Sequence, residues 1–180
     1  MRIRRIQFTA PNLAIYMIVR LTKIAMSLAL TAYVFLVTFD NIADYGSNYG
    51  FVAHVLSMDT TFPGNGLMYR SVSNHGLWTL FYWLIIAGEG VTFVLLLLGS
   101  YALWRARRER GAGFNAAKAL VIAGCGCGFI VWFFGFMVVG GEWFAMWQSK
   151  IWNGQEAAFR IYTALLGAAI FINQRDDDPA

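Results

Sequence analysis

The sequence contains few of the charged residues that a soluble domain of its length would carry. Only 13% of its 180 residues are Asp, Glu, Lys or Arg, and 58% are hydrophobic. Soluble domains carry about 25% charged residues, because a folded domain must present a polar surface to water. This deficit excludes a soluble globular protein. It predicts an integral membrane protein that forms one compact domain over residues 1–180.

The sequence also lacks the short motifs that usually mark an active site. It has no nucleophile elbow, phosphate-binding loop, dinucleotide fingerprint or zinc-ligand pattern, and no internal repeat of the kind found in transporters. Its two cysteines, Cys125 and Cys127, lie two residues apart in an apolar run, where side chains point to nearly opposite sides of a helix. No disulfide framework is therefore expected. We expect a protein that is not an enzyme and has no catalytic residues.

Long apolar runs are abundant instead. Four segments reach the roughly 17–25 mostly apolar residues that a membrane-spanning helix requires. They lie at about residues 21–39, 76–104, 118–139 and 157–173, and the outward connections between them are residues 40–75 and 140–156. The expected fold class is therefore an all-α membrane protein with four transmembrane helices.

The basic residues are distributed unequally between the two sides of these spans. Of the 14 Lys and Arg residues, only Arg70, Lys150 and Arg160 fall in or next to the outward connections. Loops rich in Lys and Arg stay in the cytoplasm, so both termini are predicted to be cytoplasmic. Because the other basic residues flank apolar runs as orientation signals do, the net charge of +4 does not indicate binding to nucleic acid.

The first outward connection, residues 40–75, is too long for a simple link, since long connections are usually structured or functional. Within it, Phe51, Val55 and Met58 recur at helical spacing. This pattern predicts a short amphipathic helix over about residues 48–58, lying flat on the membrane or tucked into it.

The second outward connection concentrates charges and indole rings, which favour the membrane interface. The candidate partner-binding residues are Glu142, Trp143, Trp147, Lys150, Trp152, Glu156 and Arg160. The charged members could form a network that joins the third span to the fourth, or a docking surface for a partner. If the third helix continues, Trp143 and Trp147 share one face. We expect the two outward connections to pack together as an extracytoplasmic cap.

Three stretches carry a family resemblance: DYGSNYGFVAHVLSMDTTFPGN, VVGGEWFAMWQS and WNGQEAAFR. They resemble the bacterial family of predicted small integral membrane proteins catalogued as domain of unknown function 2165. The similarity covers nearly the whole chain, and the outward connections are its most specific part. The resemblance implies four spans in the bacterial inner (plasma) membrane. It implies no activity and supplies no catalytic residues.

Glu89 is the acidic residue placed deep within a predicted span. It lies about 13 residues into the second span, roughly 20 Å from its start, where an unpaired carboxylate costs at least ~2.5–3.5 kcal/mol. One interpretation is a hydrogen bond between helices, with Gly88 and Gly90 allowing close approach. The other is a small transporter or channel centred on Glu89.

The two histidines, His54 and His75, both fall on the outward side. With Met58 and Met68 they could bind copper, because imidazole and thioether ligands suit that metal. Two histidines could also hold a haem. The spacing matches no established ligand pattern, and hydrogen-bonded interfacial histidines are the simpler interpretation. No cofactor is therefore predicted, and a haem or copper protein remains an alternative.

Small residues form a stripe on the third span at Gly124, Gly128 and Gly135, and the fourth span has a similar pair at Ala164 and Ala168. Such faces allow helices to approach closely. We favour packing within the bundle over contact with another subunit.

The leading hypothesis for function is an accessory subunit of a larger membrane complex of the respiratory or photosynthetic type. Its partners would be membrane lipids and either other integral membrane subunits or further copies of the same chain. The support for this hypothesis is a cap rich in aromatic and charged residues without the chemistry of an active site.

Overall fold

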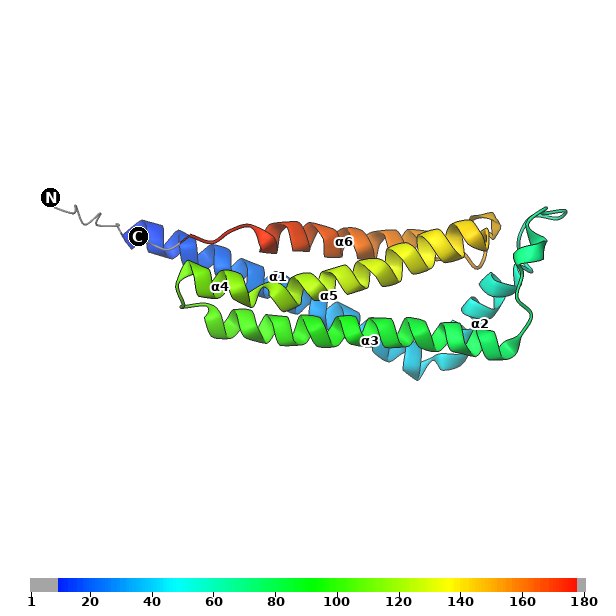
Figure 1. The fold of residues 1–180 in the computed structure, drawn as a ribbon, viewed down its shortest axis with the longest axis horizontal. Coiled ribbons are helices and arrows are strands. Elements are labelled where there is room, and N and C mark those ends of the chain that lie inside the picture. Colours follow the sequence, from blue (N-terminus) through cyan, green and yellow to red (C-terminus); the bar gives the residue numbers. More distant parts are fainter. Residues whose placement is uncertain (1–9, 178–180) are drawn as a thin grey trace.

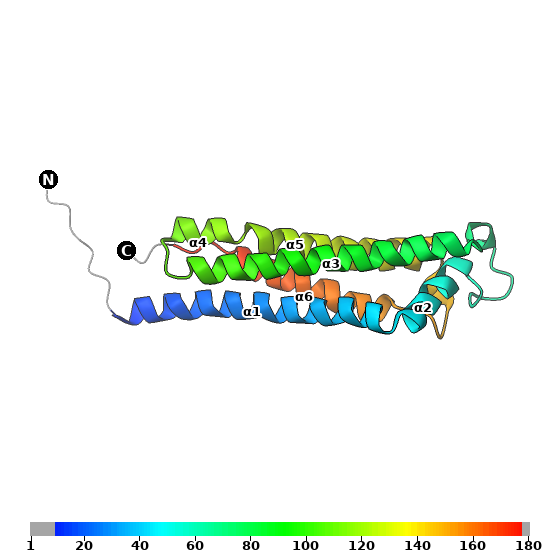
Figure 2. The same ribbon diagram turned by 90° about the horizontal axis from the view of Figure 1, so that it is seen from below.

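The computed structural model describes residues 10–177, which form an elongated bundle of four long helices closed at one end by shorter ones (Figures 1 and 2). No strand occurs among these residues. The elements in order are α1 (Ala10–Ala43), α2 (Tyr45–Ser57), η1 (Met68–Arg70), α3 (His75–Ala106), α4 (Gly111–Ala117), α5 (Ala119–Phe129), η2 (Ile130–Trp143), η3 (Met146–Gln148) and α6 (Gln155–Asn173).

Four helical stretches are long and apolar enough to cross a membrane, as the sequence predicts. They are Ile15–Ala43, His75–Ala106, Gly111–Trp143 and Gln155–Asn173, so the third comprises α4, α5 and η2. Each contains its predicted span and extends it by a few residues. Their outward faces carry large exposed apolar side chains, such as Leu84 and Ile130. Such side chains are stable against lipid, which is itself apolar.

The start of α1 and the end of the described chain lie at one end of the bundle, which we call the terminal end (Figure 1). Residues 44–74 and 144–154 form the opposite end, which we call the loop end. Two clusters of buried side chains fill the interior, one between the long helices and the other at the loop end around α2.

Helix α2 confirms the helix predicted within the first outward connection and begins three residues earlier. Its buried face, Val52, Val55 and Leu56, packs into the loop-end cluster, so the helix is tucked into the bundle. It stops at Met58, which has a left-handed conformation with φ of 56°. This backbone reversal ends the helix and turns the chain toward α3.

The third span ends at Trp143, so the alternative in which residues 142–152 continue as a helix does not hold. From Ile130 the backbone follows the wider π pattern, and the last bond of this type joins the amide of Phe144 to the carbonyl of Val139 at 3.0 Å. Ala145 then has a left-handed conformation with φ of 51°, which no regular helix accommodates. Trp143 and Trp147 therefore do not share a helix face.

Glycines let the long helices approach closely inside the bundle. A Cβ atom at Gly124 would lie 2.9 Å from Leu96 on α3, and one at Gly128 would lie 2.6 Å from Leu165 on α6. These two glycines therefore serve internal packing, as the sequence favours, while a Cβ at Gly135 would meet nothing within 4 Å.

The tightest crossing is between α3 and α5 at Gly99, where a Cβ would lie 2.6 Å from the backbone nitrogen of Val121. Backbone cannot move aside, so Gly99→Ala should lower the free energy of unfolding by about 1–3 kcal/mol. The matched control is Gly90→Ala in the same helix, where a Cβ meets nothing within 4 Å and the stability should not fall. Thermal unfolding in detergent measures both. Equal stability of the two variants would contradict this packing.

Candidate functional site

The two connections at the loop end pack on each other through polar and aromatic contacts. The Thr60 hydroxyl donates to the Ser149 hydroxyl at 2.8 Å, and the backbone amide of Phe62 donates to the Gln148 side chain at 3.0 Å. The ring of Phe62 meets Trp147 edge to face at 5.8 Å. These contacts hold two segments that are far apart in the sequence in one surface.

Arg70 anchors the end of η2, a role that the sequence did not suggest. Its guanidinium lies 4.6 Å from the ring centroid of Trp143 and donates to the Trp143 carbonyl at 3.3 Å. A cation over an indole face is attracted to it electrostatically. The signal available in the sequence was a single basic residue in a connection whose other charged residues are Asp40, Asp44 and Asp59.

The structure joins only one pair of the four charged residues expected to form a network. Arg160 contacts Glu156 one turn earlier on α6, and both side chains are exposed. Within residues 10–177, neither Lys150 nor Glu142 forms a side-chain ion pair. Lys150 is exposed and lies two residues after the end of η3.

Each histidine stacks on a tryptophan. His54 lies 4.6 Å from Trp152 with nearly parallel rings, and its Nδ1 is 2.7 Å from a carboxylate oxygen of Asp59. His75 stacks on Trp78 at 4.5 Å. Trp152, one of the predicted cap residues, therefore supports His54.

The methionines suggested as metal ligands have other surroundings. Met58 is buried among apolar side chains, and Met68 accepts a hydrogen bond from the Thr61 hydroxyl at 3.5 Å. Among the described residues no three or more His, Cys, Asp or Glu side chains gather to hold a metal ion. The arrangement therefore gives the copper or haem hypothesis no support of its own.

Glu89 is 1% exposed and pairs with a neighbouring helix. Its Oε2 accepts a hydrogen bond from the Asn41 amide at 2.7 Å, and Tyr82 donates its hydroxyl to the Asn41 carbonyl at 2.6 Å. Gly88 allows the predicted close approach, since a Cβ there would lie 2.6 Å from Val131, whereas Gly90 does not, since a Cβ there would meet nothing within 4 Å. Glu89 therefore joins α3 to α1, and the sequence did not reveal its partner because Asn41 is 48 residues away.

A cavity of about 260 Å³ lies beside Glu89, and we call it the Glu89 cavity. Side chains from five elements line it: Val37 and Asn41 of α1, Asn48, Phe51 and Val52 of α2, Tyr82, Ile85 and Glu89 of α3, Trp132 and Phe136 of η2, and Ala157, Ala158 and Ile161 of α6, with Gly154. The lining is apolar except at Glu89, Asn41, Asn48 and the Tyr82 hydroxyl. Such a combination of an apolar wall and few polar groups is typical of ligand sites.

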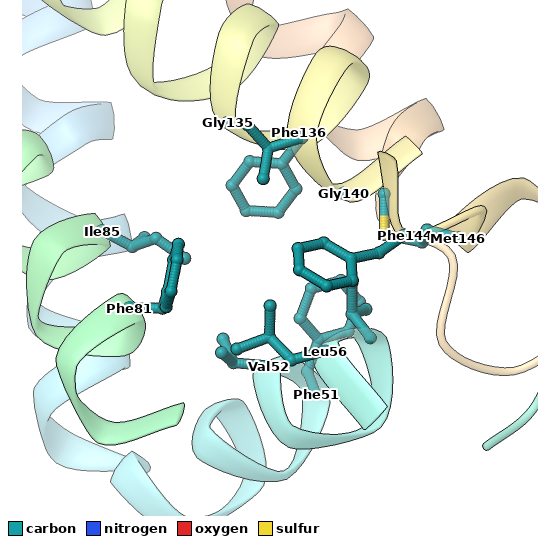
Figure 3. Close-up of a pocket in the computed structure, with 12 residues that line it drawn as sticks. Phe51, Val52, Leu56, Phe81, Ile85, Gly135, Phe136, Gly140, Phe144 and Met146 are labelled. Carbon is teal, nitrogen blue, oxygen red and sulfur yellow. The ribbon is translucent and has the colours of Figure 1, made fainter. Parts of the chain in front are cut away.

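A smaller apolar cavity of about 60 Å³ lies nearer the loop end and shares part of the same wall. The side chains of Phe81, Phe136 and Phe144 point into it from α3, η2 and the residue that follows η2 (Figure 3). Helix α2 closes the remaining side with Val52 and Leu56. The loop-end half of the bundle is thus hollow along the face of the π-helix, a geometry often found at functional sites.

The terminal end contains a buried charge cluster that the sequence did not indicate. The ammonium groups of Lys23 and Lys118 each lie 2.6 Å from Asp176 Oδ2, and both also donate to the Gln174 carbonyl. Asn115 accepts from the Asp176 amide at 3.0 Å. The cluster ties α1, α4 and α5 to the segment after α6.

Arg20 extends this cluster along α1. Its Nε lies 3.8 Å from Asp176 Oδ1, and its Nη1 donates to the carbonyls of Arg107 and Glu109 in the loop after α3. The basic residues that indicated orientation in the sequence therefore also hold the terminal end together.

Burial would raise the pKa of Asp176, but its hydrogen bonds to Lys118 and Lys23 and their positive charges outweigh this effect. The net result is a pKa below the ordinary value of 3.8. The carboxylate is therefore charged at neutral pH and stabilises the fold. This contribution is complete above the ordinary pKa and is lost as the pH falls through the lower pKa of the folded state.

One family of known proteins matches the chain. The family described as predicted small integral membrane protein (DUF2165) matches residues 19–175. No curated protein and no solved structure matches. The description of the family agrees with the four membrane-length helices.

Replacing Asp176 by Asn should destabilise the protein by about 3–5 kcal/mol, because two buried lysines lose their carboxylate. Asp177→Asn is the matched control, since that carboxylate is exposed and pairs only with Arg175. Chemical unfolding in detergent at neutral pH should separate the two variants. The difference should shrink as the pH falls below the ordinary carboxyl pKa of 3.8 and on through the lower pKa of Asp176 in the folded protein. A variant as stable as the control at neutral pH would refute the role of the cluster.

Proposed function

Because the chain belongs to this family of predicted small integral membrane proteins, we propose that it is a non-catalytic subunit that binds another membrane protein through its loop end. The proposed partner is an integral subunit of a larger complex in the bacterial inner membrane, of the respiratory or photosynthetic type. In this arrangement both termini are cytoplasmic and the loop end is an extracytoplasmic cap.

The distribution of basic residues supports this orientation. The loop end and its flank contain Arg70, Lys150 and Arg160, while the other Lys and Arg residues within residues 10–177 fall toward the terminal end. Basic residues close to the ends of spans are retained in the cytoplasm during insertion.

An exposed apolar surface at the loop end carries the proposal. We call it the cap patch, and its members are 41–76% exposed: Phe62, Met68, Tyr69, Trp143, Trp147 and Ile151. Contiguous exposed apolar surface usually marks an interaction site. Aromatic residues, Met and Arg are also the residues enriched in protein interfaces, and Arg70 lies against Trp143 within this surface.

The neighbours of the cap patch argue against burial in lipid tails. Asp59, Asn65 and Asn74 lie in the same connections and cannot dissolve in hydrocarbon without partners. The patch therefore lies at or above the headgroup region, where lipid tails do not cover it. A partner protein would remove its apolar area from water.

The orientation can be tested with single cysteines and a membrane-impermeant maleimide. Tyr69→Cys should react in spheroplasts, whereas Arg175→Cys should react only after the membrane is opened, because the two positions lie on opposite sides. The wild type, whose cysteines both lie inside a span, provides the background. Labelling of Arg175→Cys in sealed spheroplasts would invert the topology and refute the proposal.

The docking surface can be tested with a double variant, Tyr69→Ala with Ile151→Ala. Truncating a residue that dominates the binding energy of an interface costs ~2 kcal/mol or more, so recovery of a defined complex in mild detergent should fall about tenfold or more if the cap patch is the interface. The matched control is Tyr101→Ala with Ile170→Ala, which changes the same residue types at similar exposure outside the loop end. Mass spectrometry of complexes resolved on native gels identifies the partner. A wild type that migrates alone, or two double variants with the same recovery, would contradict the proposal.

A further inference from the structure

The Glu89 cavity adjoins a groove between α1 and α6. Helix α1 packs much more closely on α3 than on α6, which leaves a seam between α1 and α6. A groove of about 590 Å³ follows this seam, lined by Met26, Ala29, Leu30 and Tyr33 of α1 and by Arg160, Ile161, Ala164, Gly167 and Ala168 of α6. Ile161 lines both spaces, so the groove and the cavity meet at this side chain.

Two polar groups in the wall of the cavity lack partners. Glu89 uses only Oε2 in its bond to Asn41, and within residues 10–177 its Oε1 has no hydrogen-bond partner. The indole N–H of Trp132 likewise has none in that range, although Trp132 is only 2% exposed. In hydrocarbon no water competes for such groups, so leaving them unpaired is costly. One acceptor and one donor are thus available to a ligand that enters the cavity.

The rest of the wall selects a flat, neutral head group. Phe51, Tyr82, Trp132 and Phe136 contribute four aromatic rings to the lining. The volume of about 260 Å³ exceeds the roughly 150 Å³ of an engineered apolar cavity that holds benzene, so a substituted ring fits. No basic side chain lines the cavity, which disfavours phosphates and other anions beside Glu89.

We propose that this site binds a membrane-dissolved quinone or quinol, with its ring in the Glu89 cavity and its apolar chain in the groove between α1 and α6. A quinol donates one hydroxyl to Glu89 Oε1, and the oxygen of its second hydroxyl accepts from the indole N–H of Trp132. The small side chains of Ala164 and Gly167 leave space for the chain. Entry from the bilayer through the seam requires no opening toward water.

The test uses two probes in the reduced form: a benzoquinol with a decyl chain, and the same ring without the chain. Purified full-length protein in nanodiscs is titrated with each, and the dissociation constants are measured by equilibrium dialysis. Glu89→Leu should weaken binding of both probes about tenfold or more, because the ring loses its hydrogen bond. Trp132→Phe keeps an aromatic ring but removes the N–H, and it should weaken both probes several-fold.

Gly167→Leu separates the groove from the cavity. A Cβ at Gly167 meets nothing within 4 Å, so the larger side chain extends into the groove without disturbing the bundle. This variant should weaken binding of the decyl probe alone. Glu89→Gln preserves the shape and a hydrogen bond, so it keeps affinity within about threefold and shows that Glu89→Leu acts through the ligand. Glu142→Leu, an exposed acid outside both spaces, is the control and should bind as the wild type.

Three results would overturn the proposal. The first is an absence of saturable binding of either probe to folded wild type. The second is unchanged binding in both Glu89→Leu and Gly167→Leu. The third is displacement of the decyl probe by phospholipid with no effect of Glu89→Leu, which would assign the groove to a lipid whose headgroup meets Arg160.

Discussion

Hydrocarbon supplies no hydrogen bonds, and this constraint governs where each polar group of the protein lies. The backbone satisfies it by forming helices through the apolar stretches. The polar side chains satisfy it in pairs, as when Ser27 and Ser100 share a hydrogen bond of 2.6 Å between α1 and α3. Glu89 and Asn41 form a second such bond between the same helices, closer to the loop end. The long helices therefore adopt the rotations that bring their few polar residues together.

The two ends of the bundle are closed by different kinds of interaction. At the terminal end, Asp176 draws Lys23 and Lys118 into one buried cluster, so charge pairing fastens the segment after α6 to the first and third spans. At the loop end, α2 inserts apolar side chains between α3 and η2, and aromatic stacking fixes the connections. Substitutions in the charge cluster at the terminal end are costly, because removing one of its side chains leaves the others buried without a partner. The apolar closure is incomplete and leaves the Glu89 cavity and its smaller neighbour.

The hollow region and the cap patch lie in the same half of the molecule. Helix α2 contributes to the wall of both cavities, and the connection that follows it carries Phe62, Met68 and Tyr69 of the cap patch. A partner bound at the cap patch would therefore contact the connection that directly follows α2, the helix that closes the cavities. The π-helix η2 also links the Glu89 cavity to the cap patch. Its residues Trp132 and Phe136 line the cavity, and its last residue, Trp143, belongs to the cap patch.

The four spans and α2 could be predicted because their signals are local: the length of an apolar run and the recurrence of apolar residues every three or four positions. Glu89 stood out for the same reason, as an acid within such a run. The turn after Trp143 was not predictable in this way, since the chain from Glu142 to Trp152 suits a helix in composition. There the packing of Gly141 against Gln155 and the left-handed Ala145 determined the path.

The sequence by itself determined that this protein is a four-helix membrane protein, because apolar length and the lack of charge leave no other stable arrangement. It also singled out the residues that lie unusually deep or unusually exposed. Only the tertiary structure decided their partners: Asn41 for Glu89 across 48 residues, and Lys23 for Asp176 across 153. Contacts between distant residues depend on how the helices rotate and tilt against one another. Many weak packing contacts set those rotations jointly, and no single stretch of the sequence records them.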